Sequence, residues 1–252
     1  MLHSIGQRFL LLLVCWTGSL QAQPLRVAVA ANAQFVMEAL RTAFQQQTGV
    51  QIDAIVSSSG KLTTQIQQGA PYDVFLSADM TYPQALYQQK LTTAAPTPYA
   101  YGSLVLWTLT DLPLSADLRV LQNPAVRHIG IANPATAPYG AAAIALLTYR
   151  KRLGAVKARL VYGESIAQVN QYILSGAVEV GITAKSVVLD PNLKQRGHWI
   201  DLPPPGYTPI AQGVVILKRS TQPKVAAQFV QFLRSPAARR ILHQYGYRTP
   251  TV

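Results

Sequence analysis

The chain has 252 residues, 49% hydrophobic and only 13% charged, which excludes a disordered protein and allows one large domain or two lobes with their own cores. The formal net charge of +12 attracts anions by long-range steering. Nucleic acid is not the expected partner, because the basic residues are scattered and their densest groups, 150–152 and 239–240, lie at or inside predicted helices as solvated faces.

The first 22 residues are predicted to be a cleaved signal peptide. Arg8 is followed by the apolar run 9–16, by small and polar residues, and by a processing site after Ala22. The run is too short to anchor the protein, so we expect secretion without stable membrane insertion. Lipid attachment at Cys15 is disfavoured because Val14 stands where a small residue is needed. Cys15 is the only cysteine, so the mature chain is expected to contain no disulfide bond.

The first part of the mature chain alternates strands with helices. Residues 25–31 read as a strand of Val and Ala, and residues 33–48 carry apolar side chains at helical spacing until Gly49. Asn32 is then predicted to cap this helix, and Ser59 to open the next one. Strands at 50–56 and 73–77 and a helix at 62–68 complete a β-α-β-α-β unit with right-handed crossovers.

A middle segment repeats this alternation between two β-rich runs, 101–108 and 213–218. Its strands are predicted at 128–132, 158–162 and 178–183, and its helices at 140–152 and 166–174. The segment is therefore expected to be an inserted lobe, and the two runs that cross between the lobes form a hinge. Two further helices, at 225–233 and 236–244, are predicted to pack outside the sheets.

The predicted architecture is thus an α/β protein with two lobes, each built on a mixed, mostly parallel sheet flanked by helices. Residues 23–102 and 218–252 are assigned to the first lobe, and residues 103–217 to the second.

Four predicted strand ends lead into small or hydroxyl residues at the start of a helix. These corners are Asn32, 58–60, 138–140 and 164–166. In a parallel sheet such helix starts face the same edge, where unpaired backbone N–H groups and the positive end of the helix dipole favour negative charge. The four corners together predict one anion site that uses no Lys or Arg.

No enzyme motif is complete. Ser58 and Lys61 have the Ser-x-x-Lys spacing of penicillin-interacting hydrolases, but the companion motifs are missing. The three histidines after the leader are too far apart to show a metal-ligand pattern. A secreted hydrolase with Ser58 or Ser59 as nucleophile stays open as an alternative, which requires a base within hydrogen-bond reach of the hydroxyl. No cofactor or directly coordinated metal is expected.

Four segments resemble the periplasmic molybdate-binding proteins of ABC importers, within the wider bacterial solute-binding class. They are VAVAANAQFVM at 27–37, SSSGKLTTQI at 57–66, GAPYDVFLSAD at 69–79 and FLRSPAARRILHQYGY at 232–247. The second and third are the more specific, whereas the C-terminal pattern is shared more broadly. The resemblance covers essentially the whole mature chain and implies a two-lobed periplasmic binding protein of type II.

Members of this family hold tetrahedral molybdate or tungstate between the lobes through uncharged donors. The matching positions in this sequence are Asn32, Ser59, Tyr139 and Ile166. The last two would contribute backbone N–H groups. Ala31 is a further lining position with only its backbone N–H to offer, and Ala184 stands where some members place a tyrosine hydroxyl.

The resemblance implies a monomeric periplasmic protein that captures the oxyanion on one lobe, closes about the hinge, and passes the ligand to an inner-membrane ABC permease. Selection would depend on cavity size, because sulfate has the shape and charge of molybdate but is smaller. A binding protein for another tetrahedral anion, such as sulfate, thiosulfate or phosphate, remains an alternative at this level.

Overall fold

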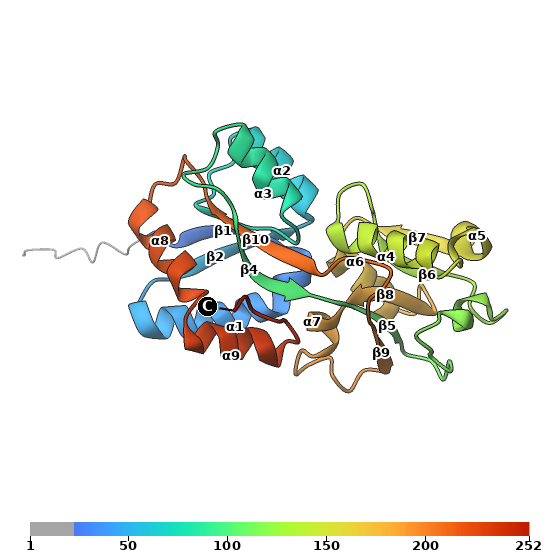
Figure 1. Ribbon diagram of the computed structural model, residues 1–252. Coiled ribbons are helices and arrows are strands. Elements are labelled where there is room, and N and C mark those ends of the chain that lie inside the picture. Colours follow the sequence, from blue (N-terminus) through green and yellow to red (C-terminus); the bar gives the residue numbers. More distant parts are fainter. Residues whose placement is uncertain (1–22, 252) are drawn as a thin grey trace, which may run out of the picture.

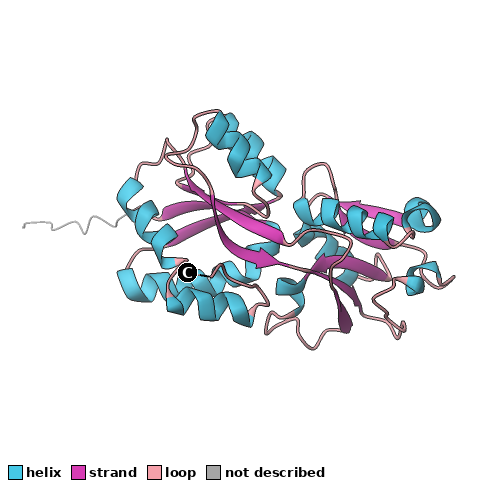
Figure 2. Ribbon diagram, viewed as in Figure 1, coloured by secondary structure: helices cyan, strands magenta, loops and turns pink. Residues whose placement is uncertain are grey.

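The computed structural model describes residues 23–251, so the expected signal peptide at 1–22 lies outside the described residues. Two lobes lie side by side, each built on one five-stranded sheet (Figure 1, Figure 2). The strand orders are β2-β1-β3-β10-β4 and β7-β6-β8-β5-β9. We call the parts of the chain built on these two sheets the first and the second lobe.

The first lobe has helices on both faces of its sheet (Figure 1). Successive residues of β1 point to opposite faces: Val27 and Val29 pack in one core and Ala28 in the other. Helices α1, α8 and α9 cover the first core, and α2 and α3 cover the second. The elements are β1 (Leu25–Ala30), η1 (Ala31–Ala33), α1 (Gln34–Thr48), β2 (Ile52–Ser57), α2 (Ser59–Gln67), β3 (Val74–Leu76), α3 (Thr81–Gln88), β4 (Thr97–Gly102), β10 (Ile210–Ile216), α8 (Pro223–Phe232) and α9 (Pro236–Gln244).

The second lobe has a single apolar core around a mixed sheet. Trp107 is fully buried there, and its indole N–H donates to the carbonyl of Arg196 at 2.7 Å. The elements are β5 (Leu104–Thr108), η2 (Arg119–Gln122), β6 (Ile129–Ala132), α4 (Pro138–Tyr149), α5 (Leu153–Val156), η3 (Lys157–Arg159), β7 (Leu160–Gly163), α6 (Ile166–Leu174), β8 (Val180–Ala184), α7 (Lys185–Val188) and β9 (His198–Leu202).

Both sheets are mixed, as predicted, but they are not mostly parallel, because each has two parallel and two antiparallel pairings. In the first, β1 is parallel to β2 and β3, whereas β10 is antiparallel to β3 and β4. In the second, β6 is parallel to β7 and β8, whereas β5 is antiparallel to β8 and β9. The strand that runs against the others is the first one after each crossing, β5 in the second lobe and β10 in the first.

The crossings differ from the sequence expectation. The run at 101–108 is two strands, β4 and β5, one in each sheet. On the return, β10 pairs with β3 and β4, so it belongs to the first lobe, and the second crossing lies between Leu202 and Ile210. The predicted second-lobe range 103–217 is therefore too long at its C-terminal end. A buried apolar run has the same sequence pattern in either sheet. Only the strands with which it pairs decide to which lobe it belongs.

Two predicted helices, α6 and α9, have the expected bounds, and most other elements differ by a few residues. Helices α3, α5 and α7 and strand β9 were not predicted. Within residues 23–251, the structure has no helix with the length and apolar character needed to cross a membrane.

Candidate functional site

A small cavity of about 10 Å³ lies between the lobes, where the first turns of η1, α2, α4 and α6 meet. That volume corresponds to about one water molecule, so the groups that line the cavity lie close together in this structure. Its lining residues carry no charged side chain: Ala30, Ala31, Asn32, Ser58, Ser59, Ala78, Ala137, Pro138, Tyr139 and Ile166. Five of the six predicted site residues are therefore together. The sixth, Ala184, is buried where β8 pairs with β5 and does not line the cavity.

Ser59 is placed to donate a hydrogen bond to a guest. It is the first residue of α2, after Ser58, whose hydroxyl caps the helix by accepting from the Lys61 N–H at 3.4 Å. The Ser59 Oγ accepts from the backbone N–H of Ala78 at 2.9 Å. No group among the described residues accepts its hydroxyl proton, so that proton is available inside the cavity.

Asn32 is not the helix cap that the sequence predicted. The residues that precede η1 and α1 are Ala30 and Ala33, and neither helix start has a side-chain cap. The Nδ2 of Asn32 donates instead to Gln212 Oε1 at 2.7 Å and to Tyr247 Oη at 2.9 Å. Its amide therefore secures the turn after β1, and its backbone N–H, in the first turn of η1, has no helical partner.

The second lobe presents two helix starts to the same cavity. Helix α4 begins at Pro138 and α6 at Ile166, and neither start has a side-chain cap. The N–H groups of Tyr139 and Ile166 belong to these first turns and have no helical partner. They add unpaired donors and the positive ends of two dipoles, which suits a buried anion.

The lobes touch around the cavity, so this structure is a closed form. On one side the Gly60 N–H donates to the Thr136 carbonyl at 2.9 Å, and the Tyr82 hydroxyl donates to the Ala135 carbonyl at 3.2 Å. Lys61 and Glu164 form an ion pair across the same side, with both side chains half exposed. Such a pair balances its own charge and adds little stability.

Comparison with known proteins places the chain in a family. The bacterial extracellular solute-binding protein family matches residues 25–248. The chain belongs to this family. It is 38% identical over 228 residues to the molybdate-binding protein ModA of Azotobacter vinelandii, with 90% of each chain covered. It is 35% identical over 223 residues to that of Rhodobacter capsulatus, with 88% of this chain and 87% of the relative covered.

Solved structures agree with this assignment. The periplasmic molybdate-binding protein of Azotobacter vinelandii superposes with a TM-score of 0.86 at 34% identity, over 90% of this chain and 100% of that one. The sulfate-binding protein SubI from Mycobacterium tuberculosis, at 15% identity and a TM-score of 0.76, shares the fold alone. The expected α/β binding-protein fold and the resemblance to molybdate-binding proteins are both confirmed.

Sequence reasoning missed three residues of this solute-binding protein that hold the site in place. Gln212, Tyr247 and Ser186 all bond to Asn32, from which they are 180, 215 and 154 residues away in the sequence. The one local signal is Gln212, a polar residue inside the apolar strand β10. All three are buried, so each must satisfy its polar atoms inside the protein.

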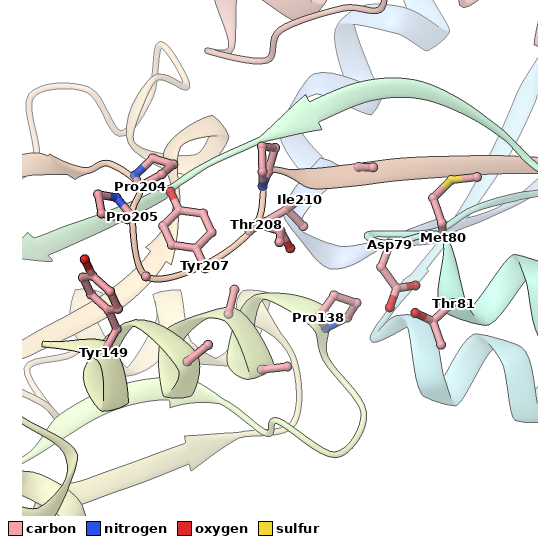
Figure 3. A pocket seen from close by; sticks show the side chains of 16 residues that line it. Asp79, Met80, Thr81, Pro138, Tyr149, Pro204, Pro205, Tyr207, Thr208 and Ile210 are labelled. Atoms are coloured by element: carbon pink, nitrogen blue, oxygen red, sulfur yellow. The ribbon is translucent and has the colours of Figure 1, made fainter. Parts of the chain in front are cut away.

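A larger groove of about 970 Å³ adjoins the cavity of the solute-binding protein and shares Pro138 with it. Figure 3 shows Tyr149 of α4 on one side and Pro204, Pro205 and Tyr207 of the second crossing on the other. Asp79 is the only charged lining residue, and burial raises its pKa. Most of its other lining residues are proline, alanine or tyrosine, so the groove is largely apolar.

Three buried tyrosines make the stability of the solute-binding protein sensitive to alkaline pH. Burial raises the pKa of Tyr247 to about 12, and those of Tyr99 and Tyr139 well above their usual value. Above pH of about 10 the unfolded chain loses these protons while the folded protein keeps them.

The free energy of unfolding is therefore expected to be intact below pH of about 10 and to fall above it, by up to about 1.4 kcal/mol per pH unit for each tyrosine. Urea unfolding at a series of alkaline pH values measures this fall. Tyr247→Phe should make the unfolding free energy fall less steeply with pH. An unfolding free energy that stays constant above pH of about 10 would contradict this expectation.

Proposed function

We propose that this protein binds molybdate or tungstate between its lobes and delivers it to an ABC permease. The observation that supports the proposal most is the meeting of uncharged donors from both lobes at one small cavity. The donors are the Ser59 hydroxyl and the first-turn N–H groups of Asn32, Tyr139 and Ile166. The names of relatives that are 35% to 38% identical point to the same ligand.

A buried oxyanion needs hydrogen bonds to nearly all of its oxygens, because the cavity has no counter-charge to offer. Donors fixed at helix starts cannot move closer together around a smaller ion. Sulfate would therefore leave some of them stretched, and size selects molybdate or tungstate over it.

Delivery places the protein in the periplasm, released from a leader at residues 1–22 and acting as a monomer. Its closed form is the species that the permease would recognise. Binding rather than catalysis is its role. The Ser58 and Ser59 hydroxyls accept from backbone N–H groups, and among residues 23–251 no base is bonded to either, so the geometry gives a hydrolase no support.

Isothermal titration of the mature protein with molybdate, tungstate and sulfate tests the proposal. We expect tight binding at one site per chain for the first two anions and much weaker binding for sulfate. Thermal unfolding gives an independent readout, because a ligand that binds only the folded protein raises the melting temperature. Equal or stronger binding of sulfate would assign the cleft to that anion instead. If none of the three anions binds, the proposal is wrong.

Ser59→Ala is expected to weaken molybdate binding by roughly 10- to 100-fold, since a hydrogen bond to a charged group contributes about 1.5–3 kcal/mol. The structure adds a stability cost that the sequence did not predict, because the buried N–H of Ala78 loses its acceptor. Titration calorimetry and urea unfolding separate the two effects. Thr64→Val removes a hydroxyl from the same helix outside the cavity and should bind normally. Unchanged affinity in Ser59→Ala would remove Ser59 from the site.

A further inference from the structure

A buried hydrogen-bond cluster joins the two lobes beside the cavity. Its members come from five separate parts of the chain: Asn32, Tyr139, Ser186, Gln212 and Tyr247, which we call the Asn32 cluster. Each is at most 3% exposed. Two members, Asn32 and Tyr139, also line the cavity, whereas the other three do not.

Three members belong to the first lobe and form a fixed base. Gln212 donates to the carbonyls of Ile210 and Ala78 at 2.7 and 3.2 Å, which leaves its Oε1 as the acceptor for Asn32. Tyr247 is held by the backbone bridge between Arg248 and Tyr101 of β4.

The second lobe contributes Tyr139, whose hydroxyl accepts from Asn32 Nδ2 at 3.5 Å, and Ser186 of α7. The Ser186 hydroxyl donates to the backbone carbonyl of Asn32 at 2.6 Å. The Tyr247 hydroxyl lies 3.0 Å from the same carbonyl and 3.2 Å from the Ser186 Oγ. One carbonyl of the first lobe is thus enclosed by two hydroxyls, one from each lobe.

The two bonds of Ser186, to the Asn32 carbonyl and to the Tyr247 hydroxyl, join groups of different lobes and break when the lobes separate. The bonds of Gln212 and Tyr247 to Asn32 lie within the first lobe and hold the Asn32 carbonyl in place for Ser186. None of them uses a ligand atom. Inside the protein they are shielded from water and therefore strong, and opening the cleft exposes their groups to solvent. The cluster consequently stabilises the closed form relative to the open one without contributing to the first encounter with the ligand.

We propose that Ser186 and Tyr247 are positioning residues that latch the closed lobes onto the Asn32 carbonyl and thereby set the rate of ligand release. This inference rests on the proposed function of the cleft. It predicts that removing the Ser186 hydroxyl accelerates dissociation and leaves association nearly unchanged, because capture on the open form precedes formation of the latch. Removing the Tyr247 hydroxyl accelerates dissociation as well, and it also frees the Asn32 amide in the open form.

The test uses Ser186→Ala and Tyr247→Phe in the mature protein, with molybdate as ligand and rapid-mixing tryptophan fluorescence as readout. We expect the dissociation rate to rise by about 3- to 10-fold in Ser186→Ala, the effect of losing the bond to the Asn32 carbonyl, with the association rate within about twofold of wild type. Tyr247→Phe should accelerate dissociation at least as much, because it also removes the acceptor of the Asn32 amide. X-ray scattering should show less complete compaction at a molybdate concentration that saturates the wild type.

Matched controls remove a buried hydroxyl that stays within one lobe. Thr183→Val breaks a bond to Asn170 in the second lobe, and Tyr72→Phe breaks one to Gln65 in the first. Both controls should release molybdate at the wild-type rate. If Tyr247→Phe does not fold, Ser186→Ala alone decides.

Wild-type release rates in Ser186→Ala would overturn the latch, and so would a loss of affinity caused by slower association. Failure of the wild-type protein to bind molybdate is a different result, because it defeats the proposed function before any variant is compared.

Discussion

Gly102→Ala is expected to weaken molybdate binding by at least about 100-fold while the ligand-free protein stays folded. A methyl group at this position would lie 2.0 Å from Tyr139 Oη and 3.1 Å from Tyr139 Cζ, both inside contact distance. Gly102 ends β4 at the first crossing, whereas Tyr139 belongs to α4 of the second lobe. The clash therefore opposes closure of the lobes rather than folding of either one.

The expected magnitude follows from the donors that closure supplies. An open cleft loses the N–H groups of Tyr139 and Ile166, and hydrogen bonds to a charged group contribute about 1.5–3 kcal/mol each. The backbone of Gly102 is not in the left-handed region, so alanine fits its local conformation.

Titration calorimetry measures the loss, and the melting temperature of the ligand-free protein reports on folding. Gly154→Ala is the matched control, since a methyl group there meets nothing within 4 Å, and it should bind normally. Adding Tyr139→Phe to Gly102→Ala removes the closest contact and should restore part of the affinity. Normal binding by Gly102→Ala would show that molybdate binding does not require Tyr139 to pack against Gly102.

Asn32→Asp is expected to reduce affinity by at least about 1000-fold at neutral pH, although the two side chains have nearly the same shape. The new carboxylate would lie beside the cavity, and two unit charges 4 Å apart repel by about 4 kcal/mol at an effective dielectric constant of 20. It would also face Gln212 Oε1, which the Asn32 amide now satisfies at 2.7 Å.

Calorimetry across a pH series provides the check. Affinity should recover as the pH falls and the new carboxyl group takes up a proton, because repulsion then disappears. Asn170→Asp is the control: Asn170 is equally buried, accepts from Thr183 at 2.7 Å and does not line the cavity. It should leave the neutral-pH affinity close to wild type. Wild-type affinity in Asn32→Asp would place the anion elsewhere.

Local sequence signals determined much of this protein. The helix starts at Ser59 and Ile166 follow from apolar periodicity and from the small or hydroxyl residues before it, which are properties of a few neighbouring residues. The helix predicted from residue 140 begins two residues earlier, at Pro138. The α/β alternation and the inserted lobe come from the same patterns. Because helix starts after parallel strands share one sheet edge, these corners also predicted a common site.

Only the tertiary structure decided which role each polar atom has. Asn32 has a suitable side chain for a helix cap, but its amide bonds to Gln212 and Tyr247, 180 and 215 residues away. Strand β10 reads as apolar in any context, and its partners β3 and β4 place it in the first lobe. Ser186 reaches the Asn32 carbonyl from the other lobe. Such choices depend on contacts between distant segments, which no local pattern specifies.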